Sequence, residues 1–394
     1  MTDTKAIVHG TVIDGTGAEP IEDGTVIIEE GRIAEVGRSA EIEVPSEAQV
    51  IEAAGKTVMP GMMEAHAHVG GDHRAQRVLR LSLQRGITTV CSVSAGPSGC
   101  ALRDAIESGE VRGCARLIAG CVVCCTNGHV RGRDADGPWE VRKGVREMVE
   151  AGADFIKTCA SGGFWAEDER CSMRNYTPEE LEALADEAHA WDRPVVVHAH
   201  TQPGINNAIA AGIDQIHHGA FIDEEGVAGI AEKGLYYVPT LRVTCTKNIQ
   251  AHSSRPWMIE EMTQSQPIHR AGVRKAKELG VKIAVGTDYP SAPSAWRIGD
   301  ATPWEWIELV EAGLTPMETL VAGTRNVAEA YGKLDELGTL EAGKRADVIV
   351  VEGNPLEDVG CLYEPDNILV VLKDGRVEST REDYKEHYRV REEL

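Results

Sequence analysis

Eight short apolar segments, separated by helical patterns, constrain the fold of this chain more than any other feature. They lie at 58–69, 88–94, 116–124, 154–160, 194–200, 214–219, 236–243 and 281–288. Runs of this kind are typical of parallel strands buried on both faces. The clearest helix signal between them is Thr177 followed by Pro178 and two acidic residues, an N-cap with proline in the first turn.

Eight strand–helix units over roughly 275 residues match the usual size of a (β/α)8 TIM-like barrel. An open doubly wound sheet is the alternative α/β architecture. It would normally carry a glycine-rich phosphate loop after its first strand, and the sequence has no such loop there. We therefore predict the barrel.

The two ends of the chain have a different sequence pattern from the middle. Short alternating segments with glycine turns occupy 5–14, 25–28 and 32–36, and similar segments return at 346–351 and 368–372. Strands of this length and spacing are typical of a small antiparallel sheet. We expect residues 1–58 and 337–380 to form one small β domain, with the barrel of residues 59–336 inserted between them. The charged C-terminal tail, 381–394, is expected to be helical or frayed.

The chain is strongly acidic, with 63 Asp and Glu against 40 Lys and Arg. Because nucleic-acid binding needs a basic surface, we exclude nucleic acid as a partner. No apolar run is long enough for a membrane span, and no signal-peptide pattern precedes the first strand. The ten cysteines then indicate reduced thiols and a cytoplasmic location. Cys121, Cys124 and Cys125 lack a second matched pair for a structural zinc, so we expect them to pack in a buried strand.

The candidates for chemistry are the polar residues that close each apolar run, because barrel enzymes place catalysis at the C-terminal ends of their strands. The first strand ends in His66-Ala67-His68, and residues two apart on a strand face the same side. Two imidazoles at this spacing can converge on one metal ion, although a structural role for either histidine is the simpler alternative.

Lys157 lies inside an apolar strand, where a charged amine is expensive to bury. It could form a buried ion pair, or extend its amine to the rim of the barrel. A third interpretation is chemical, because a deprotonated amine can add CO2. The resulting carbamate is an anionic ligand that can bridge two cations.

Three later strands also end in residues of the kind that bind metals, namely His198, His218 and Asp288. Five of the eight predicted strands then carry His, Lys or Asp near their ends. Structural roles explain such a coincidence poorly. Imidazole and carboxylate together suit zinc or a similar divalent ion.

With these motifs the chain resembles the amidohydrolase superfamily. The segments that carry the resemblance are Met59-Pro60-Gly61, His66-Ala67-His68, Phe155-Ile156-Lys157, Val197-His198, His218-Gly219, Gly286-Thr287-Asp288 and the closing segment 338–348. Finer features are similar to the branch that holds imidazolonepropionase-like and prolidase-like (Xaa-Pro dipeptidase-like) enzymes. These are Gly128-His129, Ser161-Gly162-Gly163 and Val238-Pro239-Thr240-Leu241.

The resemblance implies a β-sandwich built from both chain ends and a site for two divalent metal ions, most simply zinc. One ion would be bound by His66, His68 and Asp288, and the other by His198 and His218. A carboxylated Lys157 and a hydroxide would bridge the two ions. Homo-oligomers are common in the family, so we also expect one here.

The substrate contacts are less sharply indicated. His129 and His200 are candidates for contacts with the substrate or with the ligands, and His217 is expected to point away because its neighbour His218 points in. Carboxypeptidase-like members of the family usually carry a Tyr where this chain has Thr244. Arg242 could bind a substrate carboxylate instead. In the tryptophan-rich loop 296–306, Trp304 is expected to line an apolar pocket, with rim packing or an oligomer contact as the alternative.

The sequence thus predicts an enzyme, a metal-dependent hydrolase that cleaves an amide-type C–N bond in a small molecule. We expect a metal-bridged hydroxide as the nucleophile, with Asp288 as general acid and base. N-acyl amino acids, dipeptides, cyclic amides and aryl amides remain open as substrates. A deaminase on the same fold is the alternative enzyme, but such enzymes carry a Glu soon after the strand-5 histidine, and 198–203 contains no acid. A non-catalytic relative without metals is the last alternative, although all six expected ligands are present.

Overall fold

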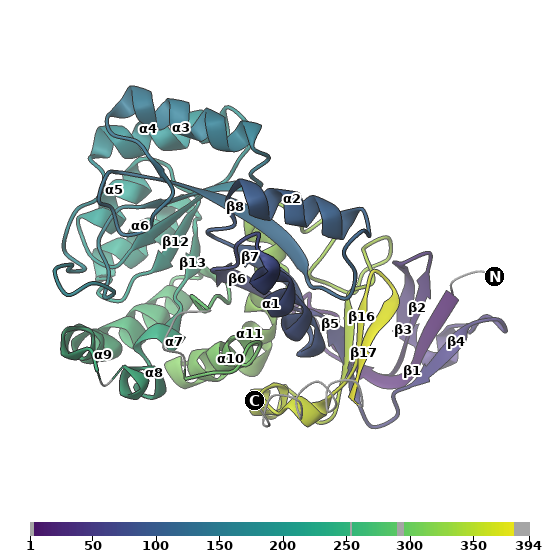
Figure 1. Cartoon of the computed structure of the whole chain (residues 1–394). Coiled ribbons are helices and arrows are strands. Elements are labelled where there is room, and N and C mark those ends of the chain that lie inside the picture. The colour runs from purple at the N-terminus through teal and green to yellow at the C-terminus, as the bar shows by residue number, and fades with distance from the viewer. Residues whose placement is uncertain (1–3, 253, 290–294, 382–394) are drawn as a thin grey trace.

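The computed structural model describes residues 4–252, 254–289 and 295–381. Its larger sheet contains eight parallel strands that follow one another in chain order around a barrel (Figure 1). These are β6 (Met62–Ala67), β7 (Ile87–Ser92), β8 (Arg116–Cys124), β10 (Phe155–Cys159), β11 (Val195–Ala199), β12 (Gln215–His218), β13 (Tyr236–Val238) and β14 (Lys282–Ile283). The short β9 (Arg133–Asp134) pairs with β8. The barrel closes where Ala67 pairs with Tyr289 and the Ala65 amide donates to the Val285 carbonyl, 2.8 Å away.

Helices surround this sheet and fill the connections between its strands. In chain order they are α1 (His73–Gln84), α2 (Gly96–Glu107), α3 (Pro138–Glu150), α4 (Pro178–His189), α5 (Gly204–Ala210), α6 (Glu224–Lys233), α7 (Leu241–Thr244), α8 (Thr246–Ala251), α9 (Pro256–Glu278), α10 (Ala301–Ala312), α11 (Pro316–Ala322) and α12 (Arg325–Ala330). The predicted N-cap of α4 is confirmed, since the Thr177 hydroxyl accepts from the Glu180 amide and the Glu180 carboxylate accepts from the Thr177 amide. None of the described helices is long and apolar enough to cross a membrane.

The second sheet is built from both ends of the chain, in the order β17-β16-β15-β5-β1-β2-β3, with β4 paired to β1. Its strands are β1 (Thr4–Val12), β2 (Ile21–Glu29), β3 (Arg32–Arg38), β4 (Gln49–Glu52), β5 (Thr57–Pro60), β15 (Val348–Val351), β16 (Ile368–Lys373) and β17 (Arg376–Thr380). Short 3-10 turns lie at 39–41, 359–362 and 365–367. One apolar cluster contains side chains of both the N-terminal and the C-terminal strands, including Val26, Ile28 and Val348. This arrangement confirms the predicted pairing of the ends, and Figure 1 shows their strands side by side.

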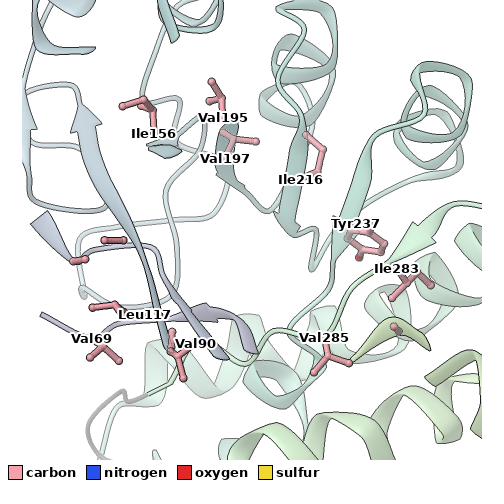
Figure 2. Close-up of a cluster of buried hydrophobic side chains, with 14 of the residues drawn as sticks. Val69, Val90, Leu117, Ile156, Val195, Val197, Ile216, Tyr237, Ile283 and Val285 are labelled. Atoms are coloured by element: carbon pink, nitrogen blue, oxygen red, sulfur yellow. The ribbon is translucent and has the colours of Figure 1, made fainter. Parts of the chain in front are cut away.

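The barrel strands lie between two apolar layers. An inner layer inside the barrel includes Met63, Phe155 and Val196. The outer layer, shown in part in Figure 2, lies between strands and helices and includes Ile156 and Val197. Because strand side chains alternate, inward-facing positions continue toward the carboxyl end of each strand and aim the side chains there into the mouth of the barrel.

Three predicted strands differ from the structure, and one of them, 281–288, is a strand only at Lys282–Ile283. Segment 58–69 contains two strands of different sheets, because the chain changes direction at Gly61, where a Cβ would lie 2.2 Å from the Thr88 hydroxyl oxygen. Segment 236–243 is a strand only to Val238, and α7 begins at Leu241 after Thr240 adopts a left-handed φ of 54°. Of the predicted tail 381–394, all but Arg381 lies outside the described residues.

Candidate functional site

A cavity of about 420 Å³ opens at the carboxyl ends of the barrel strands. Its lining is partly polar and partly apolar: His68, His129, Val130, Arg131, Phe164, Trp165, His198, His200, Arg242, Val243, Asn248, His252, Met258, Met262 and Asp288. Several of the side chains predicted to do chemistry therefore face one cavity, although they come from strands far apart in the sequence.

The first cluster at this cavity contains His66, His68 and Asp288. One ligand atom from each lies within 4.8 Å of the others. The Asp288 Oδ1 lies 2.9 Å from the His68 Nε2 and 3.4 Å from the His66 Nε2. Burial by itself would raise the pKa of the Asp288 carboxyl, but its contacts with the two histidines hold that pKa well below the usual value. Burial lowers the pKa of His66 to about 3, so its imidazole is neutral.

The second cluster contains His198, His200 and His218, with ligand atoms again within 4.8 Å of one another. Burial lowers the pKa of all three imidazoles well below the usual value. His218 is held by the Thr240 hydroxyl, 2.8 Å from its Nδ1. His200, predicted only as a possible substrate or ligand contact, therefore lies with the two predicted ligands, and its buried Nδ1 has no hydrogen-bond partner among the described residues.

Lys157 lies on β10, two residues after the inward-facing Phe155. Its side chain is 1% exposed, which excludes an amine that extends to the rim. Among the described residues its Nζ has no hydrogen-bond partner, so a buried ion pair is not found either. Burial lowers the pKa of Lys157 to about 8. The charge of Lys157 in turn lowers the pKa of His66 and His218, which places the lysine near both clusters.

Glu64 braces the first cluster, and sequence reasoning missed it. Its buried Oε1 accepts hydrogen bonds from the backbone amides of His66 and Thr287, at 2.8 and 2.9 Å. Its Oε2 accepts from the hydroxyls of Thr287 and Thr302, both at 2.8 Å. Glu64 thus ties the end of β6 to the segment that carries Asp288. The one signal in the sequence was an acidic residue within an apolar strand.

Three residues of the site adopt the left-handed backbone region without being glycine: His218 (φ 74°), Thr240 (φ 54°) and Asp288 (φ 58°). Each such conformation costs of order 1–3 kcal/mol and persists only where the surrounding structure enforces it. Strain of this kind, at the carboxyl end of β12 and in the segments that follow β13 and β14, is typical of a functional site.

The prediction that His217 points away from the site is wrong. Ile216 packs in the outer layer, so Gln215 and His217 face the barrel interior. The His217 Nδ1 lies 2.6 Å from the His66 Nδ1. His218 also points inward because its left-handed φ breaks the alternation on which the prediction rested.

Two of the predicted substrate contacts, Arg242 and His129, line the cavity and contact neighbouring residues of the site. The buried Arg242 donates from Nε to the Thr287 carbonyl, 2.5 Å away, and from Nη2 to the Asp288 carbonyl, 3.0 Å away. It therefore holds the backbone beside Asp288. The His129 ring stacks on His198 with centroids 4.0 Å apart. The His129 Nδ1 contacts the Glu169 carboxylate at 2.7 Å.

Trp304 differs from its prediction. In the described part of the chain it is not among the residues that line the cavity. From α10 its indole nitrogen donates to Glu308 (3.0 Å), and its ring faces Tyr363 with centroids 5.3 Å apart. The Lys247 ammonium lies 4.4 Å from the ring centroid. Trp304 thus packs against Tyr363 and Lys247 beside the cavity, because α10 directs its ring toward them. This packing is the alternative that the sequence left open.

Comparison with known proteins gives consistent results. The model of the amidohydrolase family matches residues 57–377. Ochratoxinase from Aspergillus niger is 30% identical, and the alignment covers 94% of this chain and 86% of that protein. An imidazolonepropionase from Geobacillus sp. (strain WCH70) is 24% identical over 91% of this chain and 90% of its own length. The crystal structure of a Xaa-Pro dipeptidase with bound methionine in the active site is similar with a TM-score of 0.84, 30% identity and coverage of 95% of this chain and 99% of that one.

Proposed function

We propose that this chain, which belongs to the amidohydrolase family and is an enzyme that hydrolyses amide-type C–N bonds, uses two divalent metal ions, most simply zinc, in this reaction. One ion is assigned to His66, His68 and Asp288, and the other to His198 and His218. Lys157 is proposed to bridge the two ions as a CO2-derived carbamate. The observation that carries the proposal is the pair of ligand clusters near one buried lysine amine, which has no hydrogen-bond partner in the part of the chain that the structure describes.

The donor set fits such ions. Neutral imidazole and carboxylate are ligands that zinc prefers. In the first cluster the lowered pKa of Asp288 keeps its carboxylate ionised and available as a ligand at neutral pH. A pKa of about 8 leaves part of Lys157 as the free amine at neutral pH, and only the free amine can add CO2. When bound, the ions would bring the pKa of water to about 7 and polarise the scissile carbonyl.

The residues of the chain supply the proton transfers. Asp288 is proposed to accept a proton from the attacking water and to deliver it to the leaving nitrogen, so that amide and water give acid and amine. Arg242 holds the carbonyls of Thr287 and Asp288 and thereby fixes the position of that carboxylate. His129 and His200 line the cavity and are proposed to contact the substrate.

The cavity supports a small-molecule substrate that has an apolar group beside a polar one. Phe164, Val243, Met258 and Met262 form an apolar part of the wall, and they belong to one buried cluster. Arg131 and the histidines supply the polar part. N-acyl amino acids, dipeptides, cyclic amides and aryl amides all meet this description, and relatives named ochratoxinase and Xaa-Pro dipeptidase support amides of this size.

Location and assembly complete the proposal. All ten cysteines are free thiols, which favours a reducing compartment such as the cytoplasm. A homo-oligomer is expected from the family resemblance alone, and light scattering on the purified protein tests it.

The test is hydrolysis by zinc-reconstituted protein across a panel of these four amide classes, with the released amine as the readout. Asp288→Asn is the matched control, since it keeps the shape of the side chain. We expect cleavage in at least one class and a rate about 10²–10⁴-fold lower in the control. Equal rates in wild type and Asp288→Asn would show that Asp288 is not the general acid and base. Release of ammonia in place of an organic amine would favour the deaminase.

A further inference from the structure

A line of buried hydrogen bonds runs through the barrel interior to the ring of His66. The Gln215 side-chain amide donates from Nε2 to the backbone carbonyl of Ala330, 2.8 Å away. The Gln215 Oε1 lies 3.1 Å from the His217 Nε2. The His217 Nδ1 lies 2.6 Å from the His66 Nδ1. None of these residues except His66 belongs to the proposed ligand set.

The chemistry of the groups fixes the direction of every bond in this line. The Ala330 carbonyl can only accept, so the Gln215 Nε2 faces it and the Gln215 Oε1 faces His217. An amide oxygen also only accepts, so the hydrogen of the His217 ring is on Nε2. His217 is completely buried, and no carboxylate of the described residues hydrogen-bonds it, so its ring is neutral. Its Nδ1 is therefore an acceptor, and the hydrogen between the two rings belongs to the His66 Nδ1.

This direction has a consequence on the other side of the His66 ring. With the hydrogen on Nδ1, Nε2 carries a lone pair, and that atom lies 3.4 Å from the Asp288 Oδ1. In this tautomer the His66 Nε2 cannot donate to Asp288, and the hydrogen bond that lowers the pKa of Asp288 comes from His68, whose Nε2 lies 2.9 Å from Oδ1. Two electron-pair donors therefore face each other between His66 and Asp288. A cation between them would relieve this arrangement, and a lone pair on Nε2 is what a metal ion requires from a histidine.

We infer that Gln215 and His217 are positioning residues that hold His66 as its Nδ1–H tautomer, and so reserve the His66 Nε2 for a metal ion. The inference rests on the proposed metal site, and it adds two residues that touch neither metal nor substrate. Partners of this kind orient metal-binding histidines, and their loss typically costs 10–100-fold in metal affinity or activity.

The first experiment reads the tautomer directly, in metal-free protein, where the ion itself cannot select it. Long-range ¹H–¹⁵N correlation spectra of full-length protein labelled on histidine distinguish protonated from unprotonated ring nitrogens, and His66→Gln assigns the signals of His66. We expect a protonated Nδ1 and an unprotonated Nε2. A protonated Nε2 would overturn the inference. Because no metal is present, this result does not depend on whether the proposed metal function is correct.

The second experiment uses a matched pair of variants, His217→Asn and His217→Leu. The two new side chains have nearly the same shape, and only asparagine offers an oxygen that can accept from the His66 Nδ1. Zn²⁺ titration against a competing chelator should show one site weakened about 10–100-fold in His217→Leu and largely restored in His217→Asn. Equal Zn²⁺ affinity in the two variants would overturn the inference. If wild-type protein binds no Zn²⁺ at all, the metal proposal fails instead. If His217→Leu does not fold, the wild-type spectrum still decides.

Discussion

Substitution of Glu64 tests whether this carboxylate stabilises the site through its hydrogen bonds. The carboxylate is 3% exposed and accepts four hydrogen bonds, two from backbone amides and two from threonine hydroxyls. In Glu64→Leu the amides of His66 and Thr287 lose their acceptor. A hydroxyl can rotate toward another partner, whereas a backbone amide cannot.

The magnitude follows from those two amides. Each buried donor left without an acceptor costs about 1–3 kcal/mol, so we expect Glu64→Leu to lower the free energy of unfolding by about 2–6 kcal/mol. Glu64→Gln is the control, because its amide oxygen can accept from both backbone amides, which share the Glu64 Oε1. Its NH2 group can donate to the threonine hydroxyls. The expected loss is then at most about 1.5 kcal/mol.

Urea unfolding of the two metal-free variants measures the difference. Zn²⁺ affinity should follow the same order, because Glu64 ties His66 to the segment that carries Asp288. If the free energies of unfolding of the leucine and glutamine variants lie within about 0.5 kcal/mol of each other, Glu64 does not brace the site through hydrogen bonds, and the reasoning is refuted.

Three further predictions follow from the lysine, the arginine and a distant ion pair. Lys157→Ala should lose most activity and one or both metals, with partial rescue by short carboxylic acids; full activity with two metals would disprove the carbamate. Arg242→Lys should lower kcat while metal content is kept, because lysine cannot reproduce its two bonds to backbone carbonyls; an unchanged kcat would contradict this. Asp374, between β16 and β17, contacts Arg116 of the barrel strand β8 at 2.8 Å. Burial raises the pKa of its carboxyl, but Arg116, Arg345 and Lys373 together hold that pKa below the usual value. The ion pair therefore stabilises the fold above the pKa of the unfolded state, and this stabilisation is lost as pH falls through the pKa of the folded state. Asp374→Asn should lower the free energy of unfolding in urea by about 1–3 kcal/mol at pH 7 and by progressively less below about pH 4. A cost that does not change with pH would contradict the ion pair.

The sequence was most informative at the strand ends. Each apolar run contained a barrel strand, and the polar residues that close these runs included His68, His198 and Asp288, which line the cavity. Lys157 follows Phe155 by two residues and His198 follows Val196 by two, so both extend the inner face toward the cavity. Residues that obey this local rule can be predicted from the order of amino acids alone.

The residues that sequence reasoning missed act through long-range contacts or through an unusual backbone. Glu64 reaches Thr287 and Thr302, and no local pattern reports such a contact. The prediction for His217 failed because His218 has a left-handed φ, which ordinary alternation does not anticipate for a residue with a side chain. Likewise Thr240 ended a predicted strand early and began α7.

The metal content of the purified protein tests the central claim most directly. We expect about two zinc ions per chain after reconstitution, falling to about one in a protein that carries both His66→Ala and His68→Ala, because those changes remove two ligands of one cluster and none of the other. A wild-type protein that binds no metal, or a double variant with unchanged zinc content, would contradict the assignment of these residues as ligands.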